Sequence, residues 1–435
     1  MKMRSLPRSV ACALWLSSSL MLTIYIVFFS TMNVSAYTTT STVAQVQTSC
    51  PAPGKARAAS MPSIKLGTHS SLIYIFNDVP HNTSTSYGRL IHYDATTGRR
   101  TEVTNSGLAL QSAQVSADGQ WILFLTTPDP RGDPNHSSLL QLVRVDGQYL
   151  QTLYCAPTGT GINNLQWATN QRLIAFSFSQ QTGGSGITLL DTHNGNLQTD
   201  LFNSRFSAPY QPLTWLDTTR LYVTNPLVDG PASELFILDT QLGPNQKTSM
   251  LQPVFNPSNR FCWNADSSYD ALSLFTTTCT SKFTSGPGPS GSQGPSSIAV
   301  RSSAGGAAHN IFTSKTLAIT AIRAINPTTL LVLVQNHSFV THVDTSKDGL
   351  WEIHTNGTSF TRLTSDPNVS QAFSPFTQFP WSNVSRDSQH FALQVNDSTH
   401  GSTSVLLGSF RSGAPITVAT AGGASSVELV GWTTM

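Results

Sequence analysis

The sequence predicts an all-β fold, a seven-bladed β-propeller with four strands per blade, from three observations: a tryptophan repeat, an in-phase series of glycine turns, and four β-like runs per repeat. Trp167, Trp215 and Trp263 lie 48 residues apart, and Trp381 and Trp432 continue the repeat further along the chain. Each tryptophan closes a short apolar stretch that leads into a polar turn. A fixed period of about 50 residues indicates a repeat architecture, and these five residues are its predicted blade markers.

Glycine-containing turns run in phase with the tryptophans. Asp-Gly and Asn-Gly favour tight turns because glycine tolerates the positive φ that such turns need. Val115 and Ala324 take the place of tryptophan in the first and fifth repeats, so both markers count seven units. The turns lie at 93–98, 145–147, 190–195 and 238–243, with weaker versions at 305–306, 356–357 and 413.

Short β-like runs fill each repeat, and their number predicts how the ring closes. The last repeat ends one strand short, while the run 71–76 before the first repeat has no unit of its own. We therefore expect the N-terminal strand 71–76 to join the C-terminal blade, which hides edges that would invite aggregation. The four runs of the second repeat are 139–145, 149–154, 162–167 and 172–177.

The turn after the first repeat carries a recognisable motif. Residues 115–124 read Val-Ser-Ala-Asp-Gly-Gln-Trp-Ile-Leu-Phe. This stretch resembles the "SPDG-W-IAF" signature of TolB-type, or PD40 (WD40-like), propeller repeats, and the resemblance extends over 71–435. Only the first repeat matches cleanly, since later ones keep the tryptophan and lose the Asp-Gly. The resemblance implies a propeller of the kind that serves as an interaction platform in the bacterial envelope or as a lid on prolyl peptidases; a fold alone does not fix a function.

Composition bounds the partners and the domain organisation. Charged residues make up 11% of the chain and the net charge is +2, which leaves no basic stripe for nucleic acid. Residues 37–70 are rich in Ser, Thr and Pro and are expected to be a linker. The propeller is expected over 71–435, interrupted by a Gly/Pro/Ser insertion loop at 281–297.

The N-terminus predicts export. Three basic residues precede an uncharged, apolar run at 10–29, the one predicted helix and one that lies outside the propeller. A run of about 20 residues is long enough to span a bilayer as an anchor. Three consecutive serines weaken it, however, and 34–36 resembles a signal-peptide cleavage site. Residues 1–36 are therefore a signal peptide or a signal anchor. The propeller is expected on the outer side of the cell membrane, or secreted if cleavage follows Ala36.

Cysteines are consistent with an oxidising compartment. An even number outside the N-terminal segment suggests disulfides, with three possible connectivities. The spacing argues against the nearest pair, because one cysteine stands beside the turn at Trp263 and the other beyond the next strand. That pair forms only if the chain folds back after Phe275, and the pairing stays open. The candidate cysteines are Cys50, Cys155, Cys262 and Cys279.

Candidate chemistry is sparse. The tryptophans could form a ligand platform, but one at the same place in each repeat is expected to pack between blades. Aspartates at the ends of strands could bind metal, but we expect them to accept hydrogen bonds from their own turns. We predict no catalytic residue, no metal ligand and no cofactor. These aspartates are Asp94, Asp146, Asp191 and Asp239.

Together these features predict a non-catalytic, membrane-tethered or secreted propeller. Its partner, an unknown protein or small ligand, would bind over the central channel, on loops between blades. The alternative is a propeller hydrolase or lactonase with a site in that channel. Such a site needs several convergent carboxylates or histidines at the channel mouth.

Overall fold

The computed structural model describes residues 47–79, 87–126, 138–180, 183–203, 210–226, 233–242, 252–255, 261–268, 272–282, 291–303, 306–336, 344–364, 370–372, 383–397, 400–411 and 413–435. The chain divides into two units, Met1–Ala44 and Gln45–Met435, and all described residues belong to the second. The predicted apolar run 10–29 therefore lies outside the described residues. Within them, the only helix is a single 3-10 turn, η1 (Thr240–Leu242).

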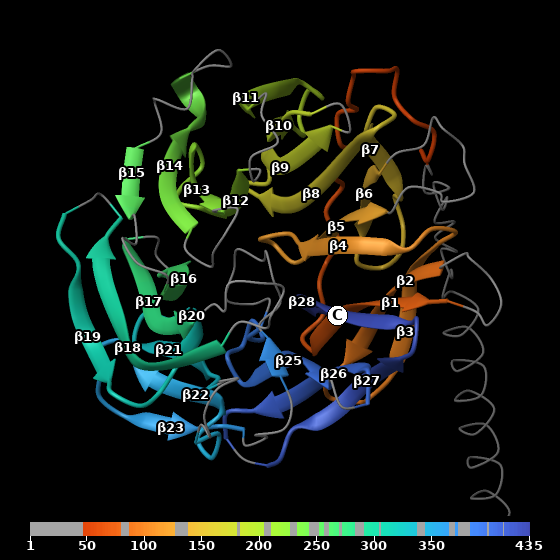
Figure 1. Cartoon of the computed structure of the whole chain (residues 1–435). Helices are drawn as coiled ribbons and strands as arrows, with labels where there is room; N and C mark the ends of the chain where they lie inside the picture. Colours follow the sequence, from red (N-terminus) through yellow and green to blue (C-terminus); the bar gives the residue numbers. More distant parts are fainter. Residues whose placement is uncertain are drawn as a thin grey trace, which may run out of the picture. The chain divides into compact units, whose positions relative to one another are not determined.

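Seven four-stranded antiparallel sheets form the domain, which confirms the predicted seven-bladed β-propeller (Figure 1). The innermost strand of each blade stands nearest the centre of the ring in Figure 1. From the innermost strand outward, blade 1 holds β28 (Ser426–Thr434), β1 (Ser70–Asp78), β2 (Tyr87–Asp94) and β3 (Arg100–Ser106), and blade 2 holds β4 (Leu110–Val115), β5 (Trp121–Thr126), β6 (Leu139–Arg144) and β7 (Gln151–Cys155). In the same order, blade 3 holds β8 (Thr160–Trp167), β9 (Leu173–Gln180), β10 (Ser185–Asp191) and β11 (Leu197–Asn203); blade 4 holds β12 (Gln211–Trp215), β13 (Arg220–Pro226), β14 (Ser233–Asp239) and β15 (Gln252–Phe255). Blade 5 holds β16 (Phe261–Ser267), β17 (Ser273–Lys282), β18 (Gly291–Ser302) and β19 (His309–Ser314); blade 6 holds β20 (Ile319–Asn326), β21 (Thr329–Val334), β22 (Gly349–His354) and β23 (Phe360–Arg362); blade 7 holds β24 (Ser370–Ala372), β25 (His390–Asp397), β26 (Ser402–Ser409) and β27 (Ile416–Gly422).

The two ends of the chain meet in blade 1. Strand β1 pairs with β28, with Leu72 opposite Trp432, as the sequence predicts. The blade boundary differs from the prediction, however. The C-terminal strand joins three N-terminal strands, so β1 does not complete a C-terminal blade. The predicted unit begins in the outer half of one blade and ends in the inner half of the next, because sequence periodicity fixes the length of a repeat but not its phase.

Burial explains why these residues form blades. A second strand is covered on both faces by neighbouring blades, so it reads as a continuous apolar run and not as an alternating one. All six residues of β5 are buried, and so are all six of β21. One hydrophobic cluster joins blades 1 and 2, and another joins blades 2 and 3. The core therefore lies between blades, which ties each blade to the next.

Three tryptophans occupy the predicted structural position. Trp167, Trp215 and Trp432 stand at or near the ends of innermost strands and are 1%, 3% and 0% exposed. Each belongs to a cluster that joins two blades. A ligand cannot reach rings buried in this way, so their place is in the core.

The other two tryptophans do not mark this position. The backbone of Trp263 pairs with Thr278 in the middle of β16, and Ser267 holds the strand-end place, opposite Leu274. In blade 7, Val384 makes the equivalent bridge to the second strand. Trp381 lies outside the described residues. The period of 48 residues at Trp263 is therefore a coincidence of spacing.

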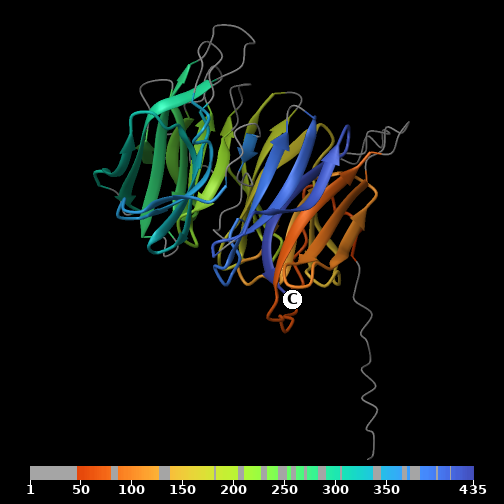
Figure 2. The same cartoon turned by 90° about the horizontal axis from the view of Figure 1, so that it is seen from below.

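Two predicted irregular segments are shorter than expected. Residues 281–282 and 291–297 of the predicted insertion loop belong to β17 and β18, which pair up to Lys282 and Gly291. The described part of the predicted linker, 47–69, packs on the propeller and belongs to the same unit. Figure 2 shows this orange-red segment at one end of the ring, beside the C-terminus. The segment lacks strand periodicity, but Ala56, Ala59 and Met61 are partly buried against blades 2 and 3.

Candidate binding site at the propeller axis

The innermost strands surround the axis, and each is the end strand of its sheet. One edge of each strand therefore has backbone N–H and C=O groups that no ladder satisfies. Side chains accept several of these N–H groups and so link neighbouring strands or blades. The pairs are Trp167 N to Gln114 Oε1 at 2.8 Å, Ile322 N to Asn264 Oδ1 at 3.1 Å, Ala324 N to Asp266 Oδ2 at 2.9 Å and Leu429 N to Gln394 Oε1 at 3.3 Å.

One ion pair joins the innermost strands of blades 5 and 6. Asp266 Oδ1 lies 3.4 Å from Arg323 Nη1, and both side chains are buried. Burial raises the pKa of Asp266 to about 6, although the charge of Arg323 and the N–H of Ala324 act in the opposite direction. A buried charge pair of this kind adds little net stability, because desolvation of the two charges offsets their attraction.

Glu428 is the most perturbed acid at the axis. It is the third residue of β28 and pairs with Ile75, so its side chain shares the face of blade 1 that packs on blade 2. The side chain is half-buried, and it has neither a hydrogen bond nor an ion pair in the described part of the chain. Desolvation raises its pKa to about 8, so Glu428 is mostly protonated at neutral pH.

The chain itself crosses the end of the ring at which the innermost strands finish. Ile64 N donates to Gln120 Oε1, and the backbones of His69 and Met435 exchange hydrogen bonds. Arg386, from the turn of blade 7, reaches past β28 to blade 2. It donates to the carbonyls of Ala117 at 2.8 Å, Ser116 at 2.9 Å and Trp432 at 3.4 Å. At the opposite end, where the innermost strands begin, Asn77 and Leu110 exchange two hydrogen bonds of 2.8 Å that tie blade 1 to blade 2.

The turn that carries Arg386 repeats the signature of the first repeat. Ser385 Oγ binds Asp387 as Ser116 Oγ binds Asp118, and each serine accepts the N–H of the residue five positions later. Ser388, with φ 55°, stands where the first repeat has Gly119, with φ 76°. Sequence reasoning missed this copy because glycine and tryptophan are both replaced. The Ser-x-Asp spacing was the signal that could have found it.

The strand-end aspartates are bound by their own turns, as expected. Each accepts the backbone N–H two residues later: Thr96 to Asp94, Gln148 to Asp146, His193 to Asp191 and Gln241 to Asp239, at 2.8 to 3.1 Å. Arg144 and Arg172 also bind two of these carboxylates. For Asp94, desolvation is outweighed by hydrogen bonds from His69 and the Thr96–Thr97 backbone, which hold its pKa well below the usual range.

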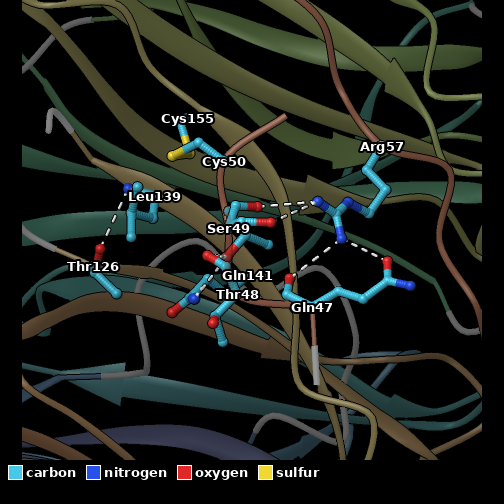
Figure 3. The surroundings of a disulfide bond; sticks show 10 residues. Gln47, Thr48, Ser49, Cys50, Arg57, Thr126, Leu139, Gln141 and Cys155 are labelled. Atoms are coloured by element: carbon cyan, nitrogen blue, oxygen red, sulfur yellow. Dashed lines mark hydrogen bonds between the residues drawn. A yellow bond between two sulfur atoms is a disulfide. The ribbon is translucent and has the colours of Figure 1, made fainter. Parts of the chain in front are cut away.

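The backbone brings the four candidate cysteines together in two pairs. Cys50 and Cys155 form a disulfide with Cα atoms 5.8 Å apart (Figure 3). Cys279 is disulfide-bonded too, and its Cα partner across the ladder is Cys262. The spacing argument against that pair was wrong, because β16 continues past Trp263 and the chain turns back between Ser267 and Ser273.

Two kinds of feature are absent from the described residues. No group of three or more His, Cys, Asp or Glu in the ranges given above could hold a metal ion. No helix in those ranges is long and apolar enough to cross a membrane.

Comparison with known proteins defines the class at the level of the fold. No family model matches the sequence, and no curated protein matches it. TolB from Acinetobacter baumannii is 14% identical with a TM-score of 0.41, and the match covers 77% of each chain. A prolyl endopeptidase is 11% identical with a TM-score of 0.52, and this chain spans 50% of its length and is itself covered to 86%. An oligogalacturonate lyase in complex with manganese is 8% identical with a TM-score of 0.51, over 79% of this chain and 98% of that one.

The chain therefore shares the β-propeller fold of these proteins. The predicted propeller is confirmed by the seven blades and by the likeness to the endopeptidase and the lyase, and the motif at 115–124 carries its TolB-type, PD40-like character. At these identities the likeness extends no further than the fold.

Proposed function

We propose that this protein is an extracytoplasmic β-propeller that binds a protein or small ligand at the end of its axis where the innermost strands begin, and catalyses no reaction on it. The observation that carries the proposal is the difference between the two ends of the ring. Contacts from Ile64, His69, Met435 and Arg386 lie at the end where the innermost strands finish. We place the ligand at the other end, near which Glu428 lies in β28.

The location follows from the cysteines and the predicted export segment. Disulfides persist in oxidising compartments and are rare in the cytosol. The Cys50–Cys155 bond therefore supports a place outside the cytoplasm, membrane-tethered through 10–29 or released after Ala36. Cell fractionation with mass spectrometry of the mature N-terminus tests this. A cytosolic chain with reduced cysteines would contradict it.

Binding is tested with the immobilised fragment 45–435. We expect it to retain a partner or ligand from an envelope extract or a fraction of the culture medium. A fragment with bulky substitutions on the innermost strands near Glu428 should lose that partner, while one altered on the outer strand β3 should keep it. Equal retention by all three would argue against an axial site.

A channel hydrolase or lactonase is the second candidate. The observation in its favour is that two carboxyls on innermost strands, Asp266 in blade 5 and Glu428 in blade 1, have raised pKa values. Strongly shifted pKa values gather at active sites. Turnover of an ester, lactone or glycoside panel by the fragment 45–435, lost in Glu428→Gln or Asp266→Asn, would favour this candidate over the binding scaffold.

A further inference from the structure

The N-terminal segment 47–61, here named the strap, lies along the outer edge of blade 2. Gln47 forms a parallel bridge with Gln151 of β7, with Gln47 N donating to Leu150 O at 3.0 Å and Thr152 N donating to Gln47 O at 2.8 Å. Thr152 Oγ1 also donates to Thr48 O at 2.9 Å. The strap therefore covers backbone groups of an edge strand that would otherwise be open.

The strap then turns back and packs between blades 2 and 3. Arg57 N donates to Leu153 O at 2.8 Å, and Ala59 N donates to Thr192 O at 2.7 Å. Ser60 and the side chain of Gln151 exchange two hydrogen bonds. Ala56, Ala59 and Met61 pack against the cluster that joins the two blades.

Arg57 and the disulfide close the strap into a compact loop. The guanidinium donates to Gln47 Oε1 at 2.5 Å and to Ser49 O at 3.0 Å, as Figure 3 shows. Cys50 then fixes this loop to Cys155, the last residue of β7. The covalent bond thus sits in the middle of the non-covalent contacts made by 47–49 and 57–60.

The two cysteines of this disulfide are more accessible to solvent than Cys279 is. Cys50 is exposed and Cys155 is half-buried, whereas Cys279 is 1% exposed. Thiol–disulfide exchange needs access of a thiolate to one sulfur. A small thiol can therefore reach Cys50 Sγ, whereas the side chain of Cys279 is covered by its neighbours.

We propose that the Cys50–Cys155 disulfide is a thiol-exchange site that controls docking of the strap, a role independent of the proposed axial ligand. A dithiol's thiolate attacks Cys50 Sγ, the S–S bond breaks, and Cys155 leaves as a thiolate that takes up a proton. The second thiol of the reductant then displaces Cys50 as a thiol, and the reductant departs as a cyclic disulfide. The protein gains two electrons and two protons.

Reduction releases the strap and leaves the ring closed. Without the covalent bond, the strap is held by hydrogen bonds at a solvent-exposed edge and by three small contacts with the core. Ring closure uses other groups: the β1–β28 ladder, the His69–Met435 pair and Arg386. The detached strap uncovers the edge of β7, a surface to which another extended chain can add as a strand.

Hydrogen exchange of the full exported chain, with and without dithiothreitol, tests the proposal. We expect peptides covering 47–61 and 151–155 to exchange at least tenfold faster after mild reduction, while peptides covering β1 and β28 stay unchanged. Alkylation should label Cys50 and Cys155 but not Cys279. Unchanged exchange in 47–61 once Cys50 and Cys155 are labelled, or a loss of protection throughout the ring, would overturn the proposal.

A variant separates the bond from the reductant. Cys50→Ser should show the fast exchange of the strap in both conditions, with no further response to dithiothreitol. Protection of 47–61 in Cys50→Ser equal to that of the oxidised protein would show that the disulfide does not control docking and would refute the inference.

Discussion

Replacing Glu428 with glutamine isolates the energetic effect of one carboxyl at the axis. Its pKa is about 8 in the folded protein, against an ordinary value of 4.5, and desolvation is the cause. Between these two values the folded state binds more protons than the unfolded state. The free energy of unfolding therefore falls as pH rises through this window, because the folded state resists ionisation of the carboxyl.

The size of the effect follows from the shift. Full desolvation would lower the free energy of unfolding by at most about 2.7 kcal/mol between pH 5 and pH 7, at about 1.4 kcal/mol per pH unit. Because the side chain of Glu428 retains partial exposure, we expect about 1 to 1.5 kcal/mol. Glu428→Gln keeps the shape of the neutral acid and cannot ionise. It should be more stable than the wild type at pH 7, with little difference at pH 4.5.

Guanidinium titrations of both proteins from pH 4.5 to pH 8.5 measure this difference. Only the gap between the two curves is attributed to Glu428, since lowered-pKa groups such as Asp94 and Asp387 contribute stability that is lost as pH falls. The exposed Glu102 on β3 gives the matched control, Glu102→Gln, for which no growing gap is expected. A constant gap for Glu428→Gln across this range would refute the reasoning.

Three further substitutions test the seam between the chain ends. Arg386→Ala should lower the free energy of unfolding by about 2 to 4 kcal/mol, with partial recovery in Arg386→Lys, because three carbonyls lose a cationic donor; calorimetry of all three proteins checks this. Trp432→Ala should cost about 3 to 5 kcal/mol by opening a cavity in a fully buried site, and a loss under 1 kcal/mol would contradict its place in the core. Gly119→Ala should destabilise more than Gly306→Ala, since both have positive φ but only the Cβ at Gly119 would lie 2.8 Å from the guanidinium of Arg386; equal melting temperatures would exclude that contact.

The periodicity of the sequence predicted the blades because every blade has the same local requirements. Every unit needs a turn after its third strand and an apolar second strand, and both leave a mark in sequence. The pairing of Leu72 with Trp432 was predictable for the same reason, since one strand was missing at one end and one was spare at the other. The phase of the blade was not, because a repeat looks the same wherever counting begins.

Contacts between blades left much weaker signals. Arg386 reaches Ala117 across 269 residues of chain, and nothing in its local sequence distinguishes it from a surface arginine. The strap lacks periodicity because it is a loop that folds back on itself and is held by groups of β7 and by Thr192 of blade 3. Glu428 was missed because an isolated acid in a strand carries no motif; its pKa depends on the apolar residues of blade 2 that face it.

The reinforcements of the seam also bear on where a ligand can bind. The β1–β28 ladder lies inside blade 1, but Arg386 joins blade 7 to blade 2, the two blades that flank it. Both Arg386 and the His69–Met435 pair lie at the end where the innermost strands finish. Near the other end, where β28 begins, Asn77 and Leu110 exchange two hydrogen bonds that also tie blade 1 to blade 2. The seam therefore resists widening of the ring at both ends, so a ligand at either end would bind a ring whose blades are already fixed in place.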